Sequence, residues 1–223
     1  MQEEAQKSQQ KMMNRIRLRG KVKEVQGTFE SWDHTFQKFL LEIKRLSGTS
    51  DIIPVVCKDD VSWMVQPGKE IIVEGSVRTR NVAEGEHNKL EITVFGFVSL
   101  PEPDEGVEEG ALTDFNEVEL DGFICKPVVL RETPFKKQIA DIFIAVNGQA
   151  NRSYYIPCVA FFNEARKASK LAVGQKIRVK GRLQSRIYNK KISETEIVAK
   201  TAYEVVLSNI DEIKEETVDG DNN

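Results

Sequence analysis

Hydrophobic and polar positions alternate along one stretch of the chain, residues 176–188. Its apolar side chains fall on alternate positions, at Ile177, Val179, Leu183 and Ile187. The positions facing the other way are Lys176, Arg178, Lys180, Arg182, Gln184, Arg186 and Tyr188. Because successive side chains of a strand point to opposite faces of a sheet, the pattern predicts a strand with one core face and one cationic face that ends in an aromatic residue.

This cationic face has two interpretations. A half-buried strand needs polar residues on its outer face, and a solvated surface would satisfy that need. Nothing in folding requires every charge to be positive or a tyrosine to follow them. The second interpretation is a groove that follows a polyanion and stacks a base.

Strand-like runs continue through residues 14–100. They cover 15–25, 39–43, 52–57, 69–80 and 90–98, separated by turns that contain glycine or proline. A short helix is expected over 59–65, because two aspartates suited to cap its start precede apolar residues at helical spacing, and Pro67-Gly68 ends the pattern.

The same order of elements returns after a linker. Residues 101–114 contain two prolines, two glycines, six acids and no base, a composition that resists packing into a core. Strand-like runs then cover 118–130, 139–146, 154–162, 176–188 and 203–210, with a helix expected over 163–171.

The two halves repeat one another in sequence. Residues 68–75 match 174–181, and Ile53-Pro54 matches Ile156-Pro157. Each half has the order β-β-β-α-β-β of an OB-fold barrel. The sequence therefore predicts an all-β protein with short helices, built from two tandem OB-fold barrels of five strands, each with one helix between strands 3 and 4. The expected parts are a polar segment (1–13), a divergent barrel (14–100), the acidic linker (101–114), a second barrel (115–210) and an acidic tail (211–223).

Five segments of the second half stand out together. They are Asn116 to Gly122, Arg131 to Pro134, Ile139 to Asn147, Tyr155 to Phe161 and Gly181 to Arg186. In this order and spacing they resemble bacterial single-stranded DNA-binding proteins. The likeness covers nearly all of residues 116–210 and extends only faintly to 14–100. It implies a groove in which bases stack on aromatic side chains while basic side chains hold phosphates.

Positions that match the family's pattern supply the candidate DNA-binding residues. Tyr155, Phe161 and Tyr188 stand where the family places base-stacking aromatics. The basic candidates are Arg131, Lys176, Arg178, Lys180, Arg182, Arg186, Lys190 and Lys191. Stacking suits any base because every base has a flat π-face. For Tyr155 and Phe161, packing in the core of a barrel is the alternative.

The first half departs from this chemistry. The outward positions of its matching strand are Glu70, Ile72, Glu74, Ser76, Arg78, Arg80 and Val82, so acids replace several bases and a valine replaces the terminal tyrosine. Lys58 likewise stands in place of Phe161. We expect this barrel to provide support, pairing or a modified groove. We expect Phe29, Trp32 and Phe36 to pack in the core or at an interface, with base stacking as their alternative.

The net charge of −3 conceals an uneven distribution. The formal charge is zero over 1–13, +1 over 14–100, −6 over 101–114, +7 over 115–210 and −5 over 211–223. A basic domain between acidic segments suits a nucleic-acid partner. The acidic tail lacks the apolar tip with which family members recruit replication enzymes. It either competes with DNA for the basic domain or only adds solubility.

Little in the sequence points to catalysis. The two histidines, His34 and His87, lie in loop-like parts without metal-ligand spacing. The three cysteines, Cys57, Cys125 and Cys158, are scattered and fit buried hydrophobic positions better than a disulfide framework. We therefore expect no enzyme, no cofactor and no metal site.

Single-stranded DNA is the expected partner. The expected function is its sequence-nonspecific binding and protection in replication, recombination or repair. Single-stranded RNA binding, or a protein-interaction or primosome accessory module, is the alternative. The resemblance also implies a homodimer with four barrels, with a monomer as the alternative, and replication or repair proteins as further candidate partners. No signal segment or membrane span is recognised, so we expect a cytoplasmic, nucleoid-associated protein.

Overall fold

The computed structural model describes residues 12–84, 87–102, 113–148, 152–191 and 197–213. Most of the polar N-terminal segment, of the acidic linker and of the acidic tail lies outside these residues. The side chains of Lys190 and Lys191 are also outside the description.

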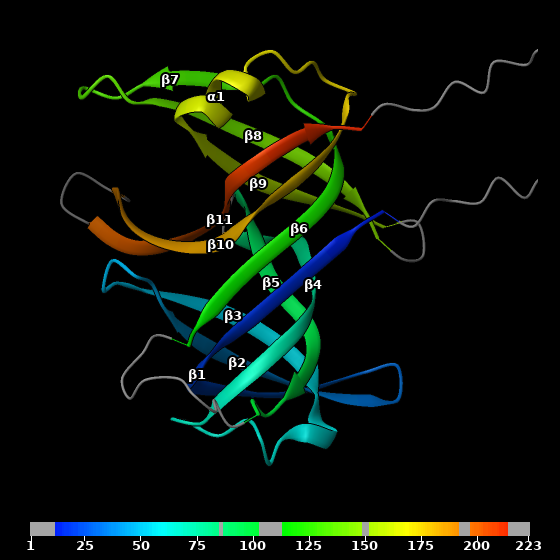
Figure 1. The fold of residues 1–223 in the computed structure, drawn as a ribbon. Helices are drawn as coiled ribbons and strands as arrows, with labels where there is room; N and C mark the ends of the chain where they lie inside the picture. Colours follow the sequence, from blue (N-terminus) through cyan, green and yellow to red (C-terminus); the bar gives the residue numbers. More distant parts are fainter. Residues whose placement is uncertain (1–11, 85–86, 103–112, 149–151, 192–196, 214–223) are drawn as a thin grey trace, which may run out of the picture.

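Five strands and one short helical turn form the first barrel (Figure 1). They are β1 (Asn14–Ser31), β2 (His34–Lys44), β3 (Ser50–Lys58), η1 (Asp59–Val61), β4 (Glu70–Glu84) and β5 (His87–Ser99). Strand β1 pairs with β2 and β4, β2 pairs with β3, and β4 pairs with β5. A parallel pairing of β3 with β5 closes the barrel. This closed five-stranded barrel confirms the predicted OB fold.

The second barrel repeats this order with one additional break. Its elements are β6 (Phe115–Ile124), β7 (Val129–Glu132), β8 (Gln138–Asn147), β9 (Ser153–Phe161), α1 (Phe162–Ala168), β10 (Lys176–Lys191) and β11 (Ile197–Glu212). Strand β6 pairs with β8 and β10, β8 pairs with β9, and β10 pairs with β11. A parallel pairing of β9 with β11 closes this barrel in turn.

Two local expectations were wrong. The strand expected over 118–130 is interrupted between β6 and β7, where Pro127 has no N–H to donate to a ladder. The helix expected over 59–65 is a 3₁₀ turn followed by further i→i−3 hydrogen bonds, such as Met64 N–H to the Val61 carbonyl. Asp59 and Asp60 lie in the first turn and do not cap it.

The apolar side chains at alternate strand positions fill both barrels as predicted, up to the point where β10 extends beyond the second barrel. Ile177, Val179 and Leu183 are fully buried. Ile187, which the pattern also assigned to the core, is 74% exposed. Beyond Ser185 the strand continues only as a two-stranded arm with β11, and such an arm has no inside. The assignment of Ile187 to the core was therefore wrong.

The glycines that align the two repeats have a packing reason. A Cβ atom on Gly75 would lie 2.2 Å from the Phe95 carbonyl oxygen, and one on Gly181 would lie 2.1 Å from that of Val206. No side chain fits at such distances. Each barrel therefore needs glycine where its fourth strand crosses close to its fifth.

The two barrels are joined through their first strands. Strands β1 and β6 pair antiparallel from Asn14↔Leu120 to Arg19↔Phe115, with buried Ile16 opposite buried Val118 near the middle. Ile16 and Val118 occupy equivalent positions in the two repeats, so the pairing relates the barrels by an approximate two-fold axis. The result is a continuous run of strands, β5-β4-β1-β6-β10-β11, across both barrels.

Two seams flank this shared pairing. In one seam, Ser185 of β10 meets β3: its Oγ accepts a 2.9 Å hydrogen bond from Ile52 N–H, and its N–H donates to buried Asp51 at 2.8 Å. Arg45 also pairs with Asp51. In the other seam, Thr79 Oγ1 of β4 accepts a 2.9 Å hydrogen bond from the N–H of Tyr155 in β9. Neither seam was predicted from the sequence.

Candidate nucleic-acid interface

Three aromatic side chains share the outer surface of β8 and β9. Phe143, Tyr155 and Phe161 alternate with buried residues of the same strands, such as Ile144 and Ile156. Tyr155 is 48% exposed, while Phe143 and Phe161 are half-buried. We call these three residues the aromatic face. Tyr155 and Phe161 therefore do not pack into the core, which was the alternative for both.

Two cations lie beside the aromatic face. Lys126 places its Nζ atom 4.5 Å from the ring centroid of Phe143. Arg131 on β7 donates two hydrogen bonds to Asp141, from Nε at 2.6 Å and Nη2 at 3.0 Å. These bonds raise the pKa of Arg131 above its usual value. Both side chains are exposed and carry positive charge at neutral pH.

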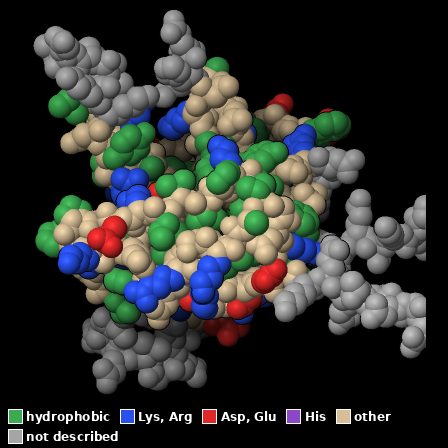
Figure 2. All heavy atoms as spheres, turned by 90° about the horizontal axis from the view of Figure 1, so that it is seen from above, with side chains coloured by type: hydrophobic (Ala, Val, Ile, Leu, Met, Phe, Trp, Pro, Cys, Tyr) green, Lys and Arg blue, Asp and Glu red, His purple; other side chains and the backbone are tan. Residues whose placement is uncertain are grey.

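Figure 2 shows the β7 and α1 end of the molecule from above. Hydrophobic side chains gather in the middle of this end, and Lys and Arg side chains lie around them with few acids between. Phe162 and Phe135, which are 57% and 85% exposed, belong to the same end of the second barrel. The combination of exposed apolar surface with surrounding positive charge is typical of surfaces that bind single-stranded nucleic acid.

The arm of β10 and β11 carries another aromatic and cationic pair. The guanidinium of Arg186 lies 5.9 Å from the ring centroid of Tyr188, which is 37% exposed. Arg186 Nε also lies 3.7 Å from a carboxylate oxygen of Glu204 on β11. The charge of Glu204 contributes to the raised pKa of Arg131 as well, which places this part of the arm in the electrostatic neighbourhood of β7.

Other predicted cations lie on a different surface, the outer face of the run β1-β6-β10. There Arg178 donates two hydrogen bonds to Asp121 at 2.7 and 2.9 Å, and Lys180 lies 3.5 Å from Glu119. Burial acts to raise the pKa of Asp121, but the hydrogen bonds and the charge of Arg178, together with smaller contributions from its neighbours, lower that pKa. Lys176 stands at the start of β10 opposite Phe123 and adds to this lowering. The charges of Arg178 and Lys180 are thus neutralised locally.

Arg182 lies at the seam between the barrels. Burial lowers its pKa, and the charge of nearby Arg45 lowers it further. Its Nη2 donates a 2.9 Å hydrogen bond to Gln184. The backbones of Lys190 and Lys191 pair with β11 in the arm. The structure therefore groups Tyr155, Phe161 and Arg131, places Arg186 and Tyr188 on the arm, and separates Lys176, Arg178, Lys180 and Arg182 from both.

The first barrel lacks an aromatic face at the equivalent positions. Leu40, Ile52 and Lys58 stand where the second barrel has Phe143, Tyr155 and Phe161. Its own aromatics pack on one another, with ring centroids of Phe36 lying 5.6 Å from Phe29 and 5.4 Å from Phe95. The guanidinium of Arg78 covers Phe95 at 3.7 Å from its centroid. Packing was the expected role of Phe29 and Phe36, and the structure agrees.

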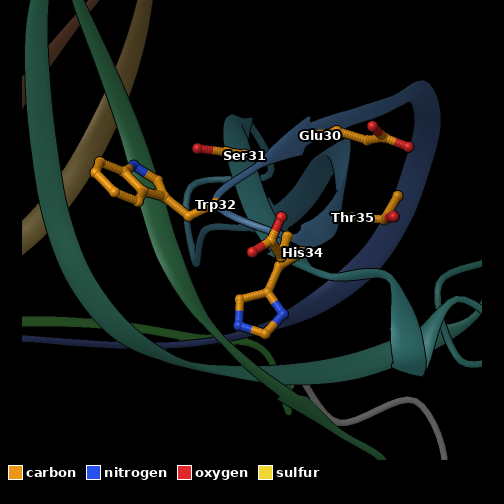
Figure 3. Close-up of a pocket in the computed structure, with 6 residues that line it drawn as sticks. Glu30, Ser31, Trp32, His34 and Thr35 are labelled. Carbon is orange, nitrogen blue, oxygen red and sulfur yellow. The ribbon is translucent and has the colours of Figure 1, made fainter.

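Trp32 behaves differently from these neighbours. It is 89% exposed at the tip of the β1–β2 hairpin, so the expectation of core packing was wrong for this residue, and packing at an interface stays a prediction. Trp32 and Asp33 both have positive φ, at 51° and 57°, as the tight turn requires. Figure 3 shows Trp32 and His34 pointing in different directions from this turn. Residues 30–35 line a hollow of about 520 Å³ there.

Phe143 and Lys126 were missed from the sequence. Phe143 stands between Ile142 and Ile144, and strict alternation marks it as an outward position. The continuous apolar run 142–146 concealed this signal. Lys126 belongs to the break between β6 and β7, which the sequence pattern did not reveal.

No metal centre is found in the described part of the chain. Among those residues, no group of three or more His, Cys, Asp and Glu side chains is placed to hold a metal ion. Cys57 and Cys158 are buried and Cys125 is partly buried. Burial raises the pKa of the Cys57 thiol to about 12, so that it stays protonated. No helix within the described ranges is long and apolar enough to cross a membrane.

Comparisons with known proteins find one family model and two similar solved structures. Residues 115–213 match the model of the single-strand binding protein family. The wild-type single-stranded DNA binding protein of Thermus aquaticus is similar in structure, with a TM-score of 0.70 and 18% sequence identity over 93% of this chain and 96% of that one. A deletion mutant of the same protein has a TM-score of 0.69 and 20% sequence identity, over 94% of this chain and 98% of that one. The two TM-scores show a shared fold. A search of curated proteins finds no match.

Proposed function

We propose that this chain, whose residues 115–213 match the single-strand binding protein family, binds single-stranded DNA on the outer surface of its second barrel. The observation that carries the proposal is the aromatic face with Lys126 and Arg131 beside it. Exposed rings stack the flat faces of unpaired bases, and flanking cations hold the phosphates. In a duplex, stacking between neighbouring base pairs hides those faces, so the same surface discriminates against double-stranded DNA.

The path of the bound single-stranded DNA continues onto the arm of β10 and β11. Tyr188 supplies a fourth stacking ring, and Arg186 has room to contact a phosphate while it stays near Glu204. Each stacked base contributes roughly 1–3 kcal/mol, independent of its identity. The binding is therefore nonspecific in sequence, which suits protection of exposed strands during replication, recombination or repair in the cytoplasm, at the nucleoid.

Arg178 and Lys180 have a weaker part in this proposal. Acids of β6 already neutralise them, and they face outward from β10 on the side of β1 and β6. A phosphate there would have to compete with Asp121 and Glu119. Near the aromatic face, a phosphate at Arg131 would likewise compete with Asp141, whereas Lys126 lies over the ring of Phe143.

We further propose that two chains form a homodimer with four barrels. The outer face of the run β5-β4-β1-β6-β10-β11 carries rows of alternating charge, in which Arg17 pairs with Glu74 at 2.7 Å and Glu117 at 3.4 Å. Phe97, which is 80% exposed, lies opposite Glu74 on this face. An exposed ring beside ordered ion pairs suits a two-fold interface. Light scattering without DNA should give twice 25.3 kDa, and a mass of 25.3 kDa would contradict the dimer.

Titration of labelled oligo-dT, oligo-U and a duplex of equal length with the full chain tests the main proposal. Oligo-dT should bind far more tightly than the duplex. Its affinity should fall steeply with salt, by ~0.7 log units per phosphate contact for each tenfold increase in concentration. Equal affinity for the duplex, or an affinity independent of salt, would contradict the proposal. Clear preference for oligo-U would assign the surface to RNA.

A further inference from the structure

Strand β9 has one edge that its own barrel leaves partly open. The strand pairs with β8 from Ser153 to Phe161, but its parallel pairing with β11 covers only Cys158 and Val159. Tyr155 lies before that short pairing. Its N–H instead donates a 2.9 Å hydrogen bond to Thr79 Oγ1 in the first barrel. The backbone of an aromatic-face residue is therefore held by the other barrel.

The position of Thr79 is itself fixed by its surroundings. Strand β4 pairs with β1 only up to Gly75 and continues beyond it along β5. Past Gly75, the side chain of Asn14 holds Val77 with two hydrogen bonds of 2.9 Å, one to its carbonyl and one from its N–H. Thr79 follows two residues later on the same edge, and its branched side chain has few rotamers. The acceptor for Tyr155 is thus held in place.

The opposite seam contains the same device around a different residue. Ser185 stands four positions after Gly181, as Thr79 does after Gly75, and its Oγ accepts a 2.9 Å hydrogen bond from Ile52 N–H. Ile52 is the equivalent of Tyr155, so this bond holds no aromatic ring. The approximate two-fold axis therefore provides two like hydrogen bonds, of which one supports the aromatic face.

We propose that Thr79 is a positioning residue for single-stranded DNA binding, acting through Tyr155; this rests on the function proposed above. The direction of the Cα–Cβ bond of Tyr155 follows from its backbone, so fixing its N–H sets the ring in line with Phe143. Without this bond, the backbone of β9 at Tyr155 has no hydrogen-bond partner on the edge away from β8 among the described residues. The ring then loses its fixed direction. The first barrel, which lacks an aromatic face, thereby shapes that of the second.

A double-mutant cycle of Thr79→Val and Tyr155→Ala tests the proposal, with oligo-dT affinity as the measurement. Valine keeps the shape of threonine and removes the acceptor. We expect Thr79→Val to weaken binding about three- to tenfold, the range that one hydrogen bond supports. Tyr155→Ala should weaken it about five- to one-hundred-fold. Because Thr79 acts through Tyr155, the double variant should bind no more weakly than Tyr155→Ala alone.

Two further variants provide the controls. Thr79→Ser keeps the hydroxyl and should restore affinity close to that of the natural chain. Ser185→Ala removes the equivalent hydrogen bond in the other seam and should leave affinity unchanged. Since both seams join the same two barrels, a general loosening of the molecule would affect Ser185→Ala as well.

The outcomes separate the two proposals. Two outcomes would overturn the positioning role and leave the proposed function standing. In the first, Thr79→Val weakens oligo-dT affinity equally in the natural chain and in the Tyr155→Ala variant. In the second, Thr79→Val does not weaken affinity at all, although Tyr155→Ala does. A Tyr155→Ala variant that binds like the natural chain would instead contradict the aromatic face itself. A loss for Ser185→Ala as large as that for Thr79→Val would also overturn the positioning role.

Discussion

The two barrels of this chain share their strand order and differ on one outer surface. Phe143, Tyr155 and Phe161 in the second barrel correspond to an aliphatic pair and a lysine in the first, as β8 and β9 correspond to β2 and β3. Inward positions stay apolar in both barrels because the fold depends on them. Outward positions are free to change, since only a ligand depends on them. The repeat thus separates the requirements of folding from those of binding.

The two seams show a similar division. One is held by a buried carboxylate, Asp51, which joins Arg45 to the backbone of Ser185. The other relies on the hydroxyl of Thr79 and its bond to Tyr155. We expect the first seam to matter chiefly for stability and the second chiefly for binding.

The largest expected effect follows from removing Asp51. Its side chain is 1% exposed, and Asp51→Ala would leave the partly buried guanidinium of Arg45 without its partner. Breaking such a pair costs about 3–5 kcal/mol of unfolding free energy. Urea unfolding measures this loss, with exposed Asp60→Ala as the control. A cost below about 1 kcal/mol, typical of a surface substitution, would show that this seam is not structural.

The next effect concerns the two arms. Tyr188→Val gives the β10–β11 arm the residue that the β4–β5 arm has at Val82, and we expect oligo-dT binding to weaken by about 1–3 kcal/mol. Ile187→Ala is the matched control, because Ile187 is the adjacent exposed residue and points the other way. Equal losses for the two variants would mean that the arm contributes apolar area and not stacking.

The smallest effect separates two groups of cations. Lys126→Gln removes a charge beside the aromatic face, while Lys180→Gln removes one that already pairs with Glu119. Affinity is measured over a range of salt concentrations, and the slope of log affinity against log salt is compared. Lys126→Gln should reduce this slope by ~0.7, the value for one phosphate contact on single-stranded DNA. The slope for Lys180→Gln should stay unchanged. A reversed result would place the DNA path along the face of β6 and β10.

The sequence predicted the barrels well because alternation reports burial directly. Val179 and Leu183 fall on the inner side of β10 as their spacing requires. Alternation does not report where a strand leaves its barrel, so Ile187 was placed in the core although it belongs to the arm. A resemblance carried by matching positions also found Tyr155 and Phe161, which alternation alone leaves ambiguous between a surface and a core.

Contacts between distant segments were beyond the reach of sequence patterns. The pairing of β1 with β6 joins two strands whose own residues give no sign of it. The ion pairs of Arg178 and Lys180 depend on which strand lies beside β10, and the acids responsible are on β6. A cationic strand in sequence therefore became a locally neutral surface in the fold. Positive charge is informative about a ligand only once its neighbours are known.

The central claim is that the second barrel binds single-stranded DNA and the first supports it. Oligo-dT affinity of two matched double variants tests it most directly: Tyr155→Ala with Phe161→Ala, and Ile52→Ala with Lys58→Ala at the equivalent positions. The first double variant should lose about 2–6 kcal/mol of binding free energy, which corresponds to two stacked bases. The second should stay within about 0.5 kcal/mol of the natural chain. Equal losses, or a larger loss for the first-barrel pair, would contradict the account.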